Sequence, residues 1–180
     1  PGGNALRAVW GAGLEAGERL LVLGPGTIGL LVAQIATAMG IEVHLVGRSQ
    51  RSRTFARALG FGNTWTRDTM PDLRWDSVVD ASNSAGLPGL AMDLVEPGRR
   101  VVYIGLAGQP SLIDTRTMAL KDVTAVGVLS ASGGLEGIAG LYASGAVDPL
   151  PLIAATVSLD EVAGVLAGSR QPDWGDAPKI

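Results

Sequence analysis

Three glycines, Gly24, Gly26 and Gly29, stand in the order Gly-x-Gly-x-x-Gly. Glycine at the first position permits backbone dihedrals that other residues avoid. At the second it lets a pyrophosphate approach the backbone, and at the third it lets the next helix pack closely on the preceding strand. Backbone N–H groups of the first helical turn, at Thr27 and Ile28, would then point at the anion. The pattern predicts a site for the phosphates of a dinucleotide.

The elements on either side of the glycines decide how much weight the motif carries. The chain contains 26 glycines, so a chance match in a loop is a real alternative. Here an apolar strand over residues 20–23 precedes the motif, and an uncharged helical stretch over 27–39 follows it. A nucleotide-binding turn needs this strand before it and this helix after it. The sequence therefore favours NAD(P) binding over a turn that only connects two elements.

The residues after the expected second strand indicate which cofactor is bound. In folds of this kind an acidic residue about 20 positions after the glycine turn binds the adenosine ribose of NAD. Residues 46–53 contain no carboxylate. Arg48 follows the strand with Ser49 as a hydroxyl donor, and a guanidinium can bind a 2′-phosphate through paired, charge-assisted hydrogen bonds. These residues favour NADP(H) over NAD(H), whereas Arg51 and Arg53 are interpreted as lying on the solvated face of a basic helix.

Strands and helices alternate along the chain, and they must position these residues. Strands are expected over 20–23, 41–47, 63–66, 76–81, 100–104 and 122–129. Helices are expected over 4–13, 27–39, 49–59, 87–95, 135–144 and 160–167, the first capped by Asn4 and the third by Ser49. Hydrophobic residues make up 47% of the chain and charged residues 17%, which suits strands buried on both faces. The sequence predicts an α/β fold, a doubly wound parallel sheet (Rossmann fold) with about six strands and helices on both faces.

Composition narrows the classes of partner. A net charge of −3 gives no electrostatic reason to expect nucleic acid or an anionic membrane. The uncharged stretch 20–41 is long enough to span a bilayer, but its glycines and Pro25 argue against a membrane helix. No secretory signal is visible, so a cytoplasmic protein is expected. With no cysteine and a single histidine, His44, inside an expected strand, no metal site and no catalytic residue is predicted.

The chain divides into two parts by pattern. Residues 1–148 carry the alternation and are assigned to a dinucleotide-binding domain. Residues 149–180 begin with prolines, continue with a brief extended piece at 156–158 and a short helix, and end in a loop. A further strand is expected to start at 179–180, as it would if the sequence were part of a longer chain.

These motifs together resemble the nucleotide-binding domain of the medium-chain alcohol dehydrogenase/reductase family. The resemblance covers nearly the whole chain and is carried by AGLEAGERLLVLGPGTIGLLVAQIATAMG, VVDASN, GRRVVYIGLAG, DVTAVGV and VSLDEVAGVL. The turn GPGTIGLL is similar to that of the zinc-dependent alcohol and polyol branch. Zinc-free quinone and enoyl reductases more often carry an alanine-rich turn.

The resemblance implies cofactor contacts at the ends of several strands. The glycine turn, with Gly24, Gly26, Thr27, Ile28 and Gly29, would hold the pyrophosphate. The adenosine ribose would be surrounded by Gly47, Arg48 and Ser49. Groove contacts are implied for Ser82 and Asn83, and nicotinamide contacts for Ile104, Gly105, Leu106, Val128, Leu129 and Ser130.

The resemblance also implies an activity that this chain would share with a second domain. In the family a catalytic domain precedes this one, holds the catalytic zinc and builds most of the substrate pocket, and residues 149–180 would return to it. The expected reaction is hydride transfer between the nicotinamide and an alcohol or carbonyl, with this chain binding cofactor but catalysing nothing alone. Dimerisation is expected through the last strand, about 122–129.

Three alternatives remain open on the sequence. The first is the cofactor domain of a zinc-free quinone or enoyl reductase, and the second is a non-catalytic nucleotide-sensing module. A methyltransferase fits less well, because the glycine spacing differs and the acidic residue that would bind the ribose is lacking.

Overall fold

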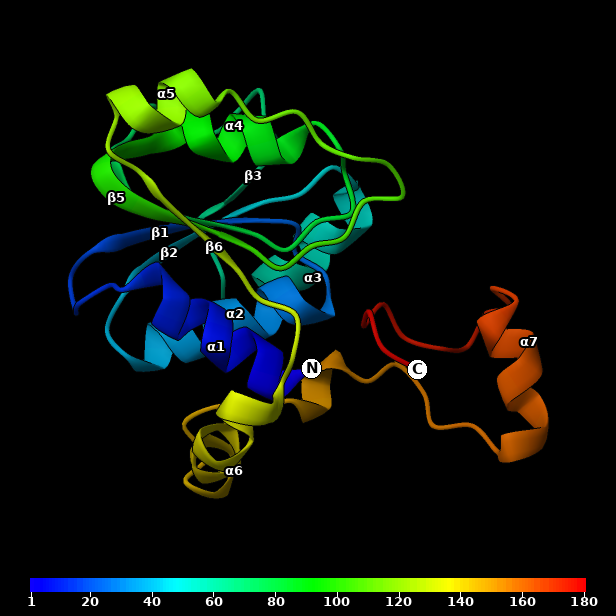
Figure 1. The fold of residues 1–180 in the computed structure, drawn as a ribbon. Helices are drawn as coiled ribbons and strands as arrows, with labels where there is room; N and C mark the ends of the chain where they lie inside the picture. Colours follow the sequence, from blue (N-terminus) through cyan, green and yellow to red (C-terminus); the bar gives the residue numbers. More distant parts are fainter.

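The computed structural model describes residues 1–180, and its central element is one sheet of six parallel strands (Figure 1). The strands are β1 (Arg19–Leu23), β2 (Glu42–Val46), β3 (Thr64–Trp65), β4 (Trp75–Asp80), β5 (Val95–Tyr103) and β6 (Thr124–Gly127). Their order across the sheet is β3-β2-β1-β4-β5-β6. The order reverses between β1 and β4, which makes the sheet doubly wound and confirms the predicted fold class.

Helices cover both faces of the sheet. Figure 1 shows α1 (Gly2–Ala12) and α2 (Thr27–Ala38) on one face, with α4 (Leu87–Leu94) and α5 (Thr115–Leu120) on the other. The remaining elements are α3 (Gln50–Ala58), α6 (Leu135–Ala143), α7 (Val162–Leu166) and the 3₁₀ turns η1 (Ser132–Gly134), η2 (Leu150–Leu152) and η3 (Leu159–Glu161).

The strand β1 shows why this sheet must be covered twice. Leu20 and Val22 point into the core formed with α1 and α2, whereas Leu21 and Leu23 point into the second core, formed with α4 and β5. Side chains alternate between the faces of a strand, so an unbroken apolar run requires apolar cover on both sides. The helix α2 is equally apolar because it packs between the sheet and α1.

The uncharged stretch 20–41 contains a strand, a turn and a helix of 12 residues. No helix in the structure combines the length and the apolar character that a membrane crossing needs.

Several predicted boundaries were wrong. Pro1, not Asn4, occupies the N-cap position of α1, and the Asn4 Nδ2 donates instead to the carbonyl of Leu129 at 3.1 Å. The strand β5 begins at Val95 rather than at 100, because Gly98 (φ 74°) carries the backbone through a register shift against β4. The strand β6 is shorter than predicted.

The helix α5 was missed by the sequence analysis. Its signal is local: the carboxylate of Asp114 accepts a hydrogen bond from the backbone N–H of Arg116 at 2.8 Å and one from the hydroxyl of Thr117 at 3.0 Å. A helix of six residues is too short to display a clear apolar period.

Residues 149–180 stand partly apart from the sheet. Figure 1 shows α7 away from the sheet, with the chain then returning toward it. The return ends at an isolated parallel bridge between Ile153 and Lys179, with hydrogen bonds of 2.7 Å from Ala154 N to Lys179 O and 3.1 Å from Lys179 N to Leu152 O. The predicted short helix is present as η3 and α7, whereas residues 156–158 form no strand.

Candidate functional site

The largest site is a cavity of about 990 Å³ at the carboxyl edge of the sheet. It contains the ends of β1, β2, β4 and β5, so it spans the point where the strand order reverses. Ligands of doubly wound sheets bind at such a point. Of the residues implied by the resemblance, the cavity brings together Gly24, Gly26, Ile28, Gly47, Arg48, Ser49, Ser82, Asn83, Ile104, Gly105 and Leu106.

The three motif glycines have three different environments. Gly24 adopts φ 98°, a conformation that other residues rarely adopt. A Cβ on Gly29 would lie 2.0 Å from the carbonyl oxygen of Gly24, so only glycine lets α2 pack this closely on the turn. A Cβ on Gly26 would meet no atom within 4 Å, and the residue lines the cavity. The turn therefore leaves open space for a ligand at Gly26, as the motif predicts.

The first turn of α2 offers backbone donors beside this space. Gly26 occupies the N-cap position and no side chain caps the helix. The first helical hydrogen bond runs from Leu30 N to Gly26 O at 2.9 Å, so the N–H groups of residues 27–29 have no backbone acceptor. Free N–H groups at a helix N-terminus bind anions. Thr27 and Gly29 do not line the cavity, so their contact with a pyrophosphate, through backbone N–H groups, stays a prediction.

Gly47 is required by packing. A Cβ at Gly47 would lie 2.6 Å from Cγ of Pro25, so the end of β2 rests on the proline ring of the glycine turn. The guanidinium of Arg53 donates to the carbonyls of Gly47 (2.8 Å) and Arg48 (2.7 Å). Its interpretation as a solvated side chain was therefore wrong, because Arg53 holds the backbone after β2 in place.

Arg48 and Ser49 differ in how free their side chains are. Arg48 is exposed at the cavity, and its guanidinium makes no hydrogen bond or ion pair in the structure. The Ser49 hydroxyl accepts from the backbone N–H of Ser52 at 3.1 Å and donates to the Ser52 hydroxyl at 2.8 Å. Ser49 is the N-cap of α3, as predicted, but its hydroxyl proton is already donated to Ser52. Arg48 alone of this pair is free to bind an anion.

The ends of β4 and β5 form the other side of the cavity. A Cβ on Gly105 would lie 1.8 Å from the carbonyl oxygen of Ser82, so the two backbones touch. The carbonyl of Asp80 accepts from the N–H groups of Ile104 and Gly105, at 3.0 and 2.8 Å. The carboxylate of Asp80 accepts a hydrogen bond from the backbone N–H of Ser82 at 3.0 Å. Asp80 thus ties the two strand ends together.

Burial raises the pKa of two side chains at the ends of β4 and β5. Asp80 is 2% exposed, and desolvation raises the pKa of its carboxyl. Burial, followed by the nearby negative charge of Asp80, raises the pKa of Tyr103 to about 12. Its hydroxyl remains protonated and donates to the carbonyl of Pro88 at 3.0 Å.

The last three residues implied by the resemblance, Val128, Leu129 and Ser130, lie outside the cavity. They follow β6 and are held against α1, where Asn4 donates to the carbonyl of Leu129 and Arg7 to that of Ser130. The structure does not bring them to the other candidate residues, so their contact with a nicotinamide stays a prediction.

Two groups of residues that line the cavity were not predicted from the sequence. Arg67 and Asp68 follow β3, and parallel strands end at the same edge, so the position of β3 was a usable signal. Arg170, Asp176, Ala177 and Pro178 come from the C-terminal loop, where no periodicity or motif indicated a role. Arg51 is exposed, as interpreted from the sequence, and it also lines the cavity.

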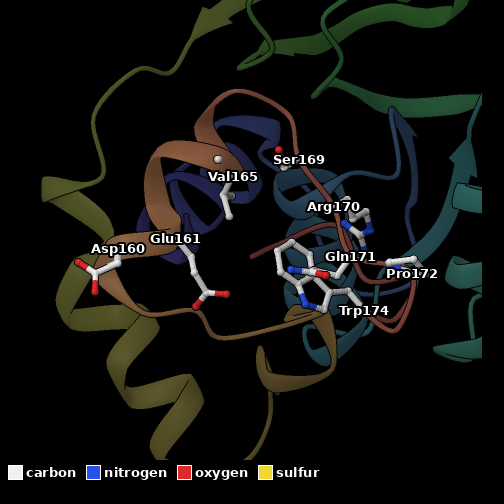
Figure 2. Close-up of a pocket in the computed structure, with 9 residues that line it drawn as sticks. Asp160, Glu161, Val165, Ser169, Arg170, Gln171, Pro172 and Trp174 are labelled. Carbon is white, nitrogen blue, oxygen red and sulfur yellow. The ribbon is translucent and has the colours of Figure 1, made fainter.

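A second cavity, of about 420 Å³, lies within the C-terminal segment itself (Figure 2). In Figure 2 the side chains of Glu161 and Val165 lie on one side of it, and Gln171 and Trp174 on the other. A hydrogen bond from the backbone N–H of Ser158, and one from its hydroxyl, lower the pKa of the Glu161 carboxyl. Arg170 lines both cavities.

The residues present do not fit a zinc site. No group of three or more histidine, aspartate or glutamate side chains is placed to hold a metal ion. His44 is 3% exposed, its Nε2 lies 2.8 Å from a carboxylate oxygen of Glu42, and its Nδ1 accepts from the Trp65 indole at 3.2 Å. Both ring nitrogens are used, so His44 is a packed imidazole.

A doubly wound parallel sheet whose first strand ends in this glycine turn defines the class of dinucleotide-binding domains of the Rossmann type. Residues 27–139 match the family model described as zinc-binding dehydrogenase. The chain belongs to this family and corresponds to its nucleotide-binding domain.

The relatives that match the chain include several dehydrogenases. The chain is 28% identical over 166 residues to 2-dehydro-3-deoxy-L-galactonate 5-dehydrogenase of Pseudoalteromonas atlantica. The match covers 86% of this chain and 48% of that protein. It is 25% identical to a solved protein of Sinorhizobium meliloti 1021 assigned as a zinc-binding dehydrogenase and bound to NADP, with a TM-score of 0.84 over 93% of this chain and 53% of that one. An alcohol dehydrogenase of Escherichia coli CFT073 in complex with NADH shares the fold, with a TM-score of 0.83 at 20% identity, over 93% of this chain and 52% of that one. The chain thus spans about half the length of these proteins.

Proposed function

We propose that the chain is the NADP(H)-binding domain of an oxidoreductase that transfers hydride between the nicotinamide and an alcohol or carbonyl substrate. The observation that carries the proposal is the glycine turn. Open space at Gly26 lies beside the unpaired N–H groups of α2, and together they fit a pyrophosphate. The relative that is 25% identical to this chain was solved with NADP.

The choice of NADP(H) rests on charge at the adenosine end of the cavity. No carboxylate occurs in residues 46–53, and Arg48 and Arg67 line the cavity with no partner for either guanidinium. A charge-assisted hydrogen bond from such a group to a 2′-phosphate contributes roughly 1.5 to 3 kcal/mol. An aspartate after β2 would instead repel that phosphate.

The bound nicotinamide would supply the hydride chemistry, and the residues of this chain would supply orientation. The first turn of α2 holds the pyrophosphate, Arg48 binds the 2′-phosphate, and the touching backbones of Ser82 and Gly105 limit how deep the cofactor can lie. Positioning of this kind can lower a barrier by roughly 7 to 11 kcal/mol. The substrate pocket and any metal ligands would come from a catalytic domain to which residues 149–180 connect.

Affinity measurements test the proposal. NADPH should bind at least about fivefold tighter than NADH, and Arg48→Ala should remove most of that difference, since one such hydrogen bond corresponds to roughly a tenfold change. Isothermal titration with both cofactors measures this. Arg116→Ala is the matched control, because Arg116 is exposed and lies outside the cavity. Equal affinities of the unaltered protein for NADPH and NADH would contradict the choice of NADP(H).

We also propose that copies of the protein pair through β6, the last strand of the sheet. Three of its four residues are exposed, and its outer edge has no neighbouring strand. Unpaired N–H and C=O groups on an edge strand favour pairing with another strand.

A further inference from the structure

The C-terminal loop brings a carboxylate to the adenosine end of the large cavity. Asp176 Oδ1 lies 2.8 Å from Nε of Arg51, and the same guanidinium donates to the carbonyl of Gly175 at 3.4 Å. Asp176 is separated from Arg51 by about 125 residues of sequence, yet both line the cavity that contains Gly47 and Arg48. Residues 46–53 lack a carboxylate, but the folded site does not.

This carboxylate is held in place by contacts on both sides. Before it, the guanidinium of Arg170 donates to the carbonyls of Gly175 and Ala177, the latter at 3.0 Å. After it, Ala177 is 5% exposed and Lys179 forms the bridge with Ile153. Asp176 therefore sits on an anchored piece of chain.

The charged residues around Asp176 would allow Arg51 to exchange this carboxylate for an anion of the ligand. Arg48 and Arg67 have no ion-pair partner, and Arg170 is occupied by carbonyls, so Arg51 is the one cation of the cavity that is paired with a carboxylate. The ion pair is partly solvated, with side-chain exposures of 51% for Arg51 and 66% for Asp176. An exposed pair of this kind is weak enough for an incoming anion to displace.

We propose that Asp176 is a specificity-determining residue that limits the preference of this domain for NADP(H), which rests on the proposed function. With NADH, Asp176 keeps Arg51 paired and offers an acceptor to the adenosine ribose hydroxyls. With NADPH, the 2′-phosphate must displace this carboxylate from Arg51 and lie close to its charge. The loop thus weakens NADPH binding without altering the glycine turn.

The test is Asp176→Asn, titrated in the intact protein with NADPH and with NADH. The substitution keeps the shape of an exposed side chain, so folding should be unchanged, as a thermal melt would verify. The ratio of NADPH to NADH affinity should rise about three- to tenfold, the range expected when a like charge and a weak ion pair are removed. Arg51→Ala should lower the ratio, because it removes the cation that the 2′-phosphate would take from Asp176.

Controls separate this inference from the proposed function. Asp173→Asn removes the same charge from the same loop at an exposed position outside the cavity, and it should leave the ratio unchanged. An unchanged ratio in Asp176→Asn, or an equal rise in Asp173→Asn, would overturn the inference while NADPH binding itself stands. If neither nicotinamide cofactor binds the unaltered protein, the proposed function fails and the inference fails with it.

Discussion

At the scale of single residues, the glycines near the cavity differ in what each makes room for. Gly29 is needed because the carbonyl of Gly24 lies where its side chain would be, whereas Gly26 faces empty space. The first is a packing requirement of the fold, and the second is a requirement of whatever fills the cavity. Stability and ligand affinity can therefore be separated by substitution.

Gly26→Ala should leave stability nearly unchanged and weaken cofactor binding at least about tenfold. The backbone at Gly26 (φ −91°, ψ −168°) suits alanine, and the new methyl group would meet no protein atom within 4 Å. It would instead stand where a pyrophosphate approaches the turn. Urea unfolding measures the first effect and titration with NADPH the second.

Two comparisons sharpen this prediction. Gly62→Ala, also in open space but outside the cavity, should affect neither quantity. Gly29→Ala should lower stability by roughly 1 to 3 kcal/mol, because α2 must shift. Unimpaired NADPH binding by Gly26→Ala would show that phosphates do not approach the turn there.

At the scale of elements, the strands and helices that show a clear hydrophobic periodicity over several residues were predictable. Buried apolar runs marked β1, β2 and β4, and Ser49 marked the start of α3. The start of β5 was not predictable to the same degree. Pro97 and Gly98 are typical of the end of an element, yet they lie within the strand. The short helix α5 had a cap but no period.

The candidate site divides in the same way. The glycine turn and Arg48 follow from residue types at fixed spacing, and the structure brings them together at one edge. The partnership of Arg51 with Asp176 depends on where a loop returns in space. No local pattern encodes a contact between residues so far apart in sequence.

The amino-terminal ends of β1 and β2 carry an ion-pair cluster that predicts acid sensitivity. Hydrogen bonds from Arg19 and then from His44 lower the pKa of Glu42 from 4.5 to about 2. Because the folded-state pKa is the lower one, the cluster stabilises the fold above pH 4.5 and loses its contribution as the pH falls from 4.5 toward 2. The Glu42 side chain is 42% exposed, so the contribution at neutral pH should be about 1 kcal/mol or less.

Glu42→Gln should therefore be less stable than the unaltered protein near neutral pH and equally stable at about pH 2. Urea unfolding across this pH range measures the difference. Glu96→Gln serves as the control, because its ion pair with Arg74 is only a 3.9 Å contact. A constant difference between Glu42→Gln and the unaltered protein at every pH would exclude the carboxylate as its source.

At the scale of the whole molecule, β6 is an edge strand whose outer side pairs with no other strand. The N–H of Val128 donates to the carbonyl of Tyr103 at 3.0 Å, and alternate residues of a strand bond to opposite sides. The N–H groups of Ala125 and Gly127 therefore point away from β5. These groups are available to a strand of a second copy.

If copies pair through β6 as proposed, Ala125→Pro should shift the protein from dimer to monomer. Proline lacks an N–H but is tolerated on an edge strand where that N–H faces solvent, so the fold of each copy should survive. Sedimentation equilibrium measures the assembly and circular dichroism the fold. Persistence of a dimer in folded Ala125→Pro would argue against pairing through β6.

The contact between Gly47 and the ring of Pro25 also bears on protein engineering. Since the end of β2 rests on the glycine turn, residues 24–26 and 47–53 constitute a single unit of exchange. A graft that transplants only the segment after β2 from another dehydrogenase would bring a loop shaped for a different turn. Transplanting both pieces together would preserve their fit, and a graft confined to residues 48 and 49 would leave it untouched.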